Sequence, residues 1–158
     1  MKKGQAMVEF ALVSMVMLVV VLGLIDFGYL FYARVGAYEQ TRIAVRYAAI
    51  NPAAWKNTQP PPGNSIEGQL RLSGVQLPND NAHITISYLV PGVGAATVCG
   101  TYDASTDAFS PAAAKATCVV TGHVVRIQAS YLYNFLTPFL KSTFGSITIH
   151  TDASALIE

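Results

Sequence analysis

The chain has 158 residues, which is room for one modest domain beside one apolar segment. Hydrophobic residues make up 52% of it and charged residues 12%, a composition too apolar for an ordinary soluble domain of this size. The net charge of +1 and the lack of a basic block argue against a nucleic-acid-binding protein.

An apolar segment near the N-terminus predicts a single transmembrane helix. Every residue from Phe10 to Ile25 is apolar or small. A bilayer core needs about 20 residues, so we extend the span to Ala33. The aromatic residues between 27 and 32 suit the interfacial belt where a span leaves the membrane. We expect Asp26 near the outer edge of the bilayer, where its carboxylate can be hydrated.

Two other interpretations of this segment stay open. A secretory signal peptide would use Lys2 and Lys3 as its basic region and Val35-Gly36-Ala37 as its cleavage site. The apolar region is longer than the usual ~7–15 residues, and Glu9 and Arg34 fit such a peptide poorly. A plain uncleaved anchor is the other interpretation.

The charges around the span do not determine its orientation. Basic residues stand on both sides of it: Lys2, Lys3, Arg34, Arg42 and Arg46. The head before the span is short, so the bulk of the chain is expected on the far side of the membrane.

The helix is predicted to continue past the membrane. Four small residues fall on one face at helical spacing: Ala37, Thr41, Ala44 and Ala48. Asn51-Pro52 is a conventional stop signal. The whole helix would have ~45 residues and a length of about 67 Å. Four charged residues are expected to face outward: Arg34, Glu39, Arg42 and Arg46.

Residues 52–158 are predicted to form an α+β domain. Alternating apolar residues predict strands at 83–90, 124–133 and 146–154. Strands with one polar face suit an antiparallel sheet that packs its apolar face on a helix. The expected inward residues are Ile84, Ile86, Tyr88, Val90, Val125, Ile127, Ala129, Tyr131, Tyr133, Ile147, Ile149, Thr151 and Ala153.

Other parts of this domain are predicted to be connections or short helices. Gln59 to Gly63 is a polyproline-type linker, with a docking motif for a proline-binding partner as the alternative. Asn64-Ser65 caps a short helix that ends near Gly74, with Ile66, Leu70 and Leu72 facing inward. Residues 136–144 form a short crossing helix or turn.

Cys99 and Cys118 are the two cysteines of the chain. In an extracytoplasmic domain we expect them to form one disulfide, worth about 3 kcal/mol for a loop of this length. Free thiols are the alternative. Between them, Tyr102 and Phe109 are the only large apolar residues, so the loop from 100 to 117 is expected not to order itself.

The sequence shows no motif for catalysis. GxSxG, the phosphate-binding P-loop and HExxH are all missing. Gly92 and Gly94 make a lone GxG that indicates a turn, and His83, His123 and His150 are scattered. We therefore expect no enzyme, no cofactor, no metal and no small-molecule substrate.

Glu9 is the residue that the apolar segment leaves unexplained. A charged group at membrane depth is costly and is a functional hypothesis by default. The alternative is a glutamate at the level of the lipid headgroups, where its cost is lower.

The stretch around Glu9 resembles a known type of leader. Gly4-Gln5-Ala6-Met7-Val8-Glu9-Phe10 is similar to a class III prepilin leader, in which a short basic head ends in glycine. In that family a prepilin peptidase cuts after the glycine, and the fifth residue of the mature chain is glutamate. Counted from Gln5, Glu9 is the fifth residue.

Further stretches resemble TadE-like proteins, which are minor pilins or pseudopilins of tight-adherence systems. They are IDFGYLFYAR at 25–34, Thr41-Arg42, RYAA at 46–49, and the C-terminal part from 124 to 158. The family usually has prolines in the early apolar segment, whereas Ser14-Met15 stands there in this chain.

The resemblance implies a pilin-like α+β fold in four parts: a leader at 1–4, a transmembrane half-helix at 5–33, an extramembrane half-helix at 34–51, and an extracytoplasmic domain at 52–158. Cleavage after Gly4 would leave a cationic amino group on Gln5. Glu9 would pair with that group in its own chain or in a neighbour, because desolvated charges are tolerable only when paired. Each incoming subunit would thus be set in register.

The implied partners are inner-membrane lipid, the prepilin peptidase, other pilin subunits and the pilus assembly platform. The chain would be a single-pass inner-membrane protein that later enters a pilus on the cell surface. A membrane-anchored binding or scaffold module that never enters a filament is the second hypothesis, and an enzyme is the third.

Overall fold

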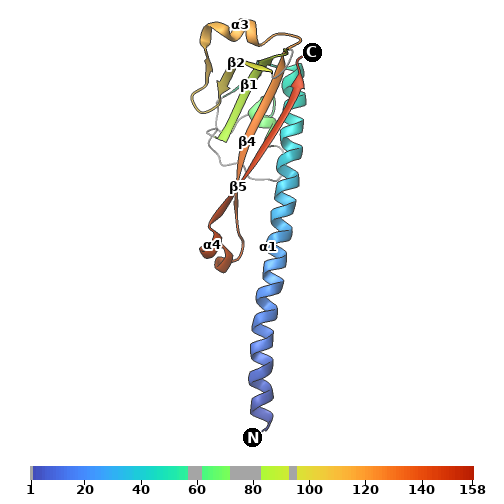
Figure 1. Cartoon of the computed structure of the whole chain (residues 1–158), viewed down its shortest axis with the longest axis vertical. Helices are drawn as coiled ribbons and strands as arrows, with labels where there is room; N and C mark the ends of the chain where they lie inside the picture. The colour runs from blue at the N-terminus through green and yellow to red at the C-terminus, as the bar shows by residue number, and fades with distance from the viewer. Residues whose placement is uncertain (1, 57–61, 72–82, 93–95) are drawn as a thin grey trace.

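The computed structural model describes residues 2–56, 62–71, 83–92 and 96–158. One long helix, α1 (Lys2–Ile50), runs the whole length of the molecule, and a sheet packs along the half that is farther from the N-terminus (Figure 1). The predicted α+β fold is confirmed. The C-terminus lies beside the end of α1, at the opposite end from the N-terminus (Figure 1).

Within the described residues, five strands form one antiparallel sheet in the order β3-β2-β1-β4-β5. The strands are β1 (Ile84–Val90), β2 (Thr97–Asp103), β3 (Ala108–Ser110), β4 (Val124–Asn134) and β5 (Ser146–Leu156). The short helices are α2 (Ile66–Gln69), η2 (Ala112–Ala114), α3 (Lys115–Cys118) and α4 (Pro138–Phe144).

Helix α1 has the two halves that the sequence predicts. It ends at Ile50, because a residue before proline disfavours helical backbone and Pro52 lacks the N–H that a helix needs. The small residues predicted on one face are all fully buried: Ala37, Thr41, Ala44 and Ala48. Their size lets the sheet approach the helix closely. The four charged residues expected to face outward are all exposed.

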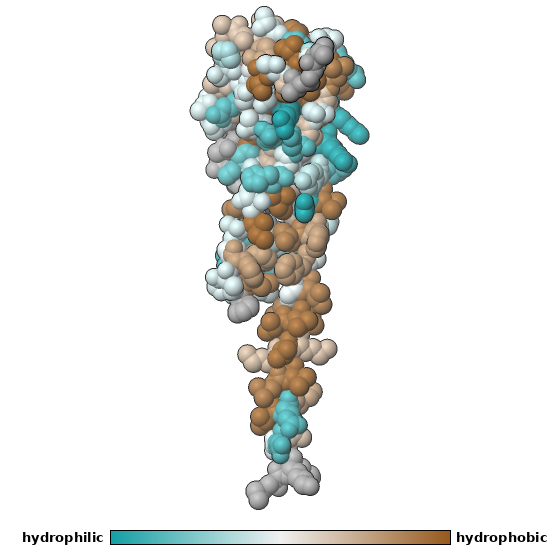
Figure 2. Space-filling model, in the orientation of Figure 1, coloured by the Kyte–Doolittle hydropathy of each residue, from teal (hydrophilic) through white to brown (hydrophobic). Residues whose placement is uncertain are grey.

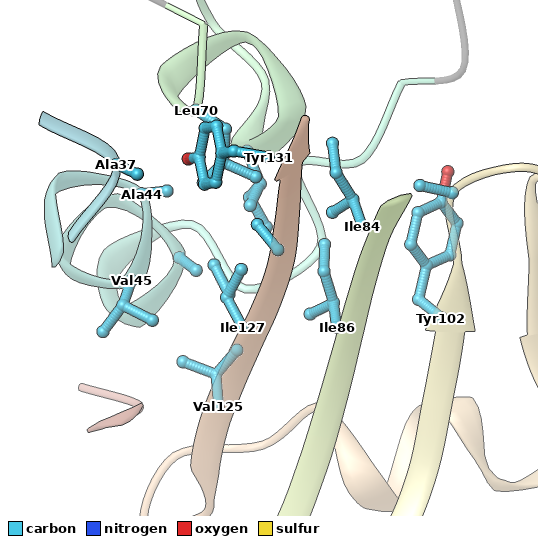
Figure 3. Packing of buried hydrophobic residues seen from close by; sticks show 14 of the residues in the cluster. Ala37, Ala44, Val45, Leu70, Ile84, Ile86, Tyr102, Val125, Ile127 and Tyr131 are labelled. Atoms are coloured by element: carbon cyan, nitrogen blue, oxygen red, sulfur yellow. The ribbon is translucent and has the colours of Figure 1, made fainter. Parts of the chain in front are cut away.

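The apolar face of the sheet covers this stripe of α1 (Figure 3). In β4 every second side chain points to the helix, as predicted, and all five are buried: Val125, Ile127, Ala129, Tyr131 and Tyr133. From β5, Ile149 and Thr151 are buried against the helix as well. The period-2 pattern of these strands therefore sets which face of the sheet meets α1.

A buried pair of hydroxyl groups joins α1 to the last strand. The Oγ1 atoms of Thr41 and Thr151 lie 2.7 Å apart. The Thr41 hydroxyl is also 2.9 Å from the carbonyl oxygen of Ala37, and the Thr151 hydroxyl is 3.2 Å from that of Ala129. Both buried hydroxyls therefore have partners, as polar groups in a core require.

Two predicted details differ from the structure. Ser65 caps α2 as expected, but the helix ends at Gln69 and not near Gly74, since Gly68 is a poor helix former in so short a helix. Val90, expected to be buried, is 39% exposed at the end of β1. The predicted positions of Leu72, Gly74, Gly94 and the prolines at 60 and 61 lie outside the described residues.

Residues 100–117, predicted to be a loop that needs the disulfide to hold it, are tied by that bond but also contain regular structure. They contribute to the β2–β3 hairpin, followed by η2 and α3. The reason is Trp55, which stacks on Tyr102 with 4.7 Å between ring centroids and on Phe109 with 5.7 Å. Gly100 makes room for this packing, because a Cβ atom there would lie 2.5 Å from the Phe109 ring. Aromatic packing thus orders a segment that looks too polar to fold.

Candidate functional site

The first half of α1 presents apolar side chains in all directions. The large apolar residues from Met7 to Ile25 are exposed, and the N-terminal part of the helix stands clear of the domain (Figure 2). Among the described helices, α1 is the one long and apolar enough to cross a membrane. A helix that is apolar on every side needs lipid or other helices around it. The structure therefore contains one candidate membrane anchor.

The predicted processing and registration residues lie together at the free end of this half-helix. Gln5 and Glu9 are one turn apart, and the Gln5 side-chain amide donates a hydrogen bond of 3.3 Å to Oε1 of Glu9. Around Gly4, no atom lies within 4 Å of the place where a Cβ would stand. The fold itself therefore does not require glycine at this position.

The expectation of a hydrated carboxylate at Asp26 is wrong. Asp26 is 0% exposed, because the connection between β4 and β5 reaches down along α1 and covers it. Its two carboxylate oxygens accept hydrogen bonds from the backbone N–H groups of Leu136, at 2.9 Å, and Thr137, at 3.1 Å. The Thr137 hydroxyl donates to Asp26 as well. We call this connection, residues 135–145 with α4 inside it, the hairpin tip.

A continuous row of aromatic rings links α1 to the hairpin tip. The ring centroids of Tyr32 and Tyr29 are 6.1 Å apart, and those of Tyr29 and Tyr133 are also 6.1 Å apart. Tyr133 then contacts Phe135 at 5.5 Å, and Phe135 contacts Phe144 at 6.1 Å. The Tyr133 hydroxyl donates to the backbone carbonyl of Asp26 at 3.1 Å. We call these five residues the aromatic row.

The two cysteines lie at the opposite end of the domain. Cys99 in β2 and Cys118 in α3 form a disulfide, with 5.5 Å between their Cα atoms. The bond ties α3 to the sheet near Trp55 and the rings of Tyr102 and Phe109 that stack on it. The Lys115 ammonium stands 4.5 Å from the Trp55 ring centroid. This end of the domain is the one farthest from the N-terminus of α1 (Figure 1).

A polar groove of about 470 Å³ runs over the open face of the sheet. His83, His150 and Asp152 contribute to it, but His150 bonds the Ser130 hydroxyl and Asp152 pairs with Arg126. The hydrogen bond from Arg126 lowers the pKa of the Asp152 carboxyl. In the part of the chain that the structure describes, no group of three or more His, Cys, Asp or Glu side chains could hold a metal ion.

The contacts of three residues that shape these features are not indicated by the sequence. Asp26 and Thr137 are partners across more than a hundred residues, and Trp55 stands in a segment that looks like the start of a linker. The one signal for Asp26 is that an acidic residue at the end of an apolar segment needs hydrogen-bond donors. Its donors are two backbone N–H groups and the Thr137 hydroxyl, and nothing in the sequence near Asp26 points to them.

Residues 4–49 match the family model described as TadE-like protein. The match covers almost the whole of α1, including Gly4, Gln5, Glu9 and Asp26, and confirms the resemblance stated above for this part of the chain. No match to the chain was found among curated proteins or solved structures.

Proposed function

We propose that this chain, whose long helix matches the TadE-like family, is a minor pilin or pseudopilin of a tight-adherence system. It would be cleaved after Gly4 by a prepilin peptidase and would act in pilus assembly or adhesion. One observation carries the proposal: a single unbroken helix of 49 residues is bare and apolar in one half and packed under a sheet in the other. Such a helix suits a subunit that has two successive environments.

The first environment is the membrane. The bare half of α1 anchors the chain in the inner membrane, with the domain on the outer side. Gly4 and the residues around it are exposed at the end of the helix, so a membrane-embedded peptidase could reach the bond before Gln5.

The second environment is a bundle of neighbouring helices. The apolar side chains that lipid covers in the membrane can pack on other subunits in a filament. Glu9 would then meet the amino group of Gln5 in an adjacent subunit, where a pair of desolvated charges replaces two isolated ones. Function on this proposal is assembly, with no catalytic step.

The test is to shear pili from cells that make this chain and to look for it in the filament fraction. We expect a chain that begins at Gln5 and co-purifies with the major pilin. A chain that stays wholly in the membrane fraction, while normal pili form, would contradict the proposal. That result would favour the second hypothesis, an anchored binding or scaffold module.

A further inference from the structure

We propose that the hairpin tip rests on the outer face of the lipid bilayer, so that the domain contacts the membrane at a second place besides α1. This inference depends on the proposed anchoring of α1. The partner of the tip is the lipid surface. Three features support the contact: the height of the tip, meaning its position along α1 relative to the bilayer, the exposed apolar side chains of the tip, and the aromatic row.

The height follows from the length of the bare helix. From Met7 to Ile25 the helix rises about 28 Å at 1.5 Å per residue. That is close to the roughly 30 Å of a bilayer core. Asp26, the next residue, therefore stands where α1 leaves the hydrocarbon, and the rest of the predicted span, up to Ala33, lies at the level of the lipid headgroups. Because Asp26 holds the backbone of Leu136 and Thr137 directly, the hairpin tip lies at the same height.

The tip exposes large apolar side chains at this height. Leu136 and Phe144 are each 61% exposed, although they belong to the folded domain. The outward face of β4 carries the polar residues Arg126, Gln128 and Ser130, then the exposed Leu132, and ends in the polar Asn134. Figure 2 shows the hydrophobic surface of α1 continuing onto the lower part of the domain.

The aromatic row adds the side chains that prefer a membrane interface. Tyrosine is enriched where a membrane protein meets the headgroups, because one end of the ring is apolar and the other polar. In this chain the exposed members of the row are Tyr29 and Tyr32 on α1 and Phe144 on the tip, and the two rings that connect them, Tyr133 and Phe135, are buried. Lys141 is exposed on α4 and can extend its ammonium group to lipid phosphates. The interfacial belt is thus shared by the helix and the domain.

The lipid contact can be measured with spin labels at three exposed leucines of the full chain. Leu18 in the bare helix is 58% exposed, Leu136 in the tip is 61% exposed, and Leu156 at the far end of β5 is 56% exposed. Each is changed to cysteine in turn, without reductant, so that the Cys99–Cys118 disulfide is not labelled. Phe144→Cys serves as a second tip position.

The labelled proteins are placed in vesicles of phosphatidylethanolamine and phosphatidylglycerol at a high lipid ratio. Oxygen concentrates in the lipid, so frequent collisions of the spin label with oxygen show that the label lies in lipid. A water-soluble nickel chelate stays in the aqueous phase, so frequent collisions with it show that the label lies in water. We expect Leu18→Cys in lipid and Leu156→Cys in water. At Leu136→Cys and Phe144→Cys, the ratio of oxygen to nickel collisions should be severalfold higher than at Leu156→Cys.

Three results would overturn the inference. If the tip labels meet the nickel chelate as often as Leu156→Cys does, while Leu18→Cys is in lipid, only the tip contact is wrong. If the tip labels are shielded from both reagents and become open to water when more lipid is added, a second copy of the chain covers the tip instead. If Leu18→Cys itself is in water, the anchoring and the tip contact both fail.

Discussion

Asp26 in the middle of α1 accepts hydrogen bonds from the backbone N–H groups of Leu136 and Thr137, which lie 110 and 111 residues further along the chain. The bond from Leu136 measures 2.9 Å and that from Thr137 3.1 Å, and the carboxylate is fully covered. Hydrogen bonds to a charged acceptor are the stronger kind. Asp26 is therefore the residue that holds the hairpin tip against the helix.

Replacing Asp26 should loosen the tip and leave the rest of the domain folded. Hydrogen bonds to charged groups contribute about 1.5–3 kcal/mol each, and 1.4 kcal/mol is a factor of ten in an equilibrium. We expect Asp26→Asn to speed trypsin cleavage after Lys141, in the tip, by about tenfold or more. Asp103→Asn, at the other end of the domain, is the control. Equal cleavage of Asp26→Asn and the wild type would show that the carboxylate does not hold the tip.

Gly4→Leu should block maturation without disturbing the fold. A side chain at position 4 meets nothing in the structure, so any requirement for glycine comes from the peptidase. Gly23→Leu, which also meets nothing within 4 Å, places the same change within the apolar segment as a control. Mass spectrometry should find a chain that begins at Gln5 in the wild type and the control, and an uncut chain in Gly4→Leu. A mature Gly4→Leu chain would refute cleavage at this site.

Glu9→Ala should insert and mature normally but fail to enter pili. Removing a charge makes the span more apolar, so insertion has no reason to fail. Removing one partner of a buried ion pair costs about 3–5 kcal/mol, so we expect incorporation to fall by at least about tenfold. Glu39→Ala, on the outer face of α1, is the control. Wild-type amounts of Glu9→Ala in sheared pili would count against the pairing.

Loss of the disulfide should weaken the domain and leave the anchor unaffected. Cys99 and Cys118 are 19 residues apart, and closing such a loop stabilises by about 2–4 kcal/mol. We expect the double variant Cys99→Ser/Cys118→Ser to melt at a lower temperature but to remain in the membrane fraction. Intact mass with and without reductant checks the bond itself. Two thiols that react with an alkylating agent before reduction would disprove it.

Glu67→Gln should stabilise the protein at neutral pH. Burial raises the pKa of the Glu67 carboxyl above its ordinary value of 4.5. Below that value the group is protonated in both the folded and the unfolded chain and costs nothing. As the pH rises through 4.5 and then through the raised folded pKa, the unfolded chain ionises more readily and the wild type loses stability.

Glutamine carries no charge and keeps an oxygen for the backbone N–H of Lys56, which bonds Glu67 at 3.2 Å. The melting temperature of Glu67→Gln should therefore exceed that of the wild type at pH 7, and the difference should vanish near pH 4. Glu39→Gln is the exposed control. A variant that is less stable than the wild type at pH 7 would show that the carboxylate is stabilising.

Periodic patterns allowed most of the helix and three strands to be predicted from sequence. The alanines of α1 recur at helical spacing, and the apolar residues of β4 recur at every second position, because each element has one face against the core. Gly4, Gln5 and Glu9 are indicated by their order along the chain, and no knowledge of a three-dimensional contact is needed to select them.

The remaining features depend on partners that are distant in sequence. Asp26 accepts hydrogen bonds from two backbone N–H groups and the Thr137 hydroxyl, all more than a hundred residues away, and no pattern around Asp26 indicates them. The β2–β3 hairpin has few apolar residues of its own and is ordered by Trp55, which comes before it in an unrelated segment. Local patterns do not contain such contacts.

The contact of Thr41 with Thr151 has a consequence for the order of events during synthesis. The two residues are 110 positions apart, and a ribosome adds about 5–20 residues per second, so roughly 6–22 s separate the making of α1 from the making of its partner strand. For that time the alanine stripe has no sheet to cover it, while the apolar half of the helix is already available to the membrane. The apolar half of α1 can therefore insert as a bare helix, and the sheet packs on the other half only after β5 has been made.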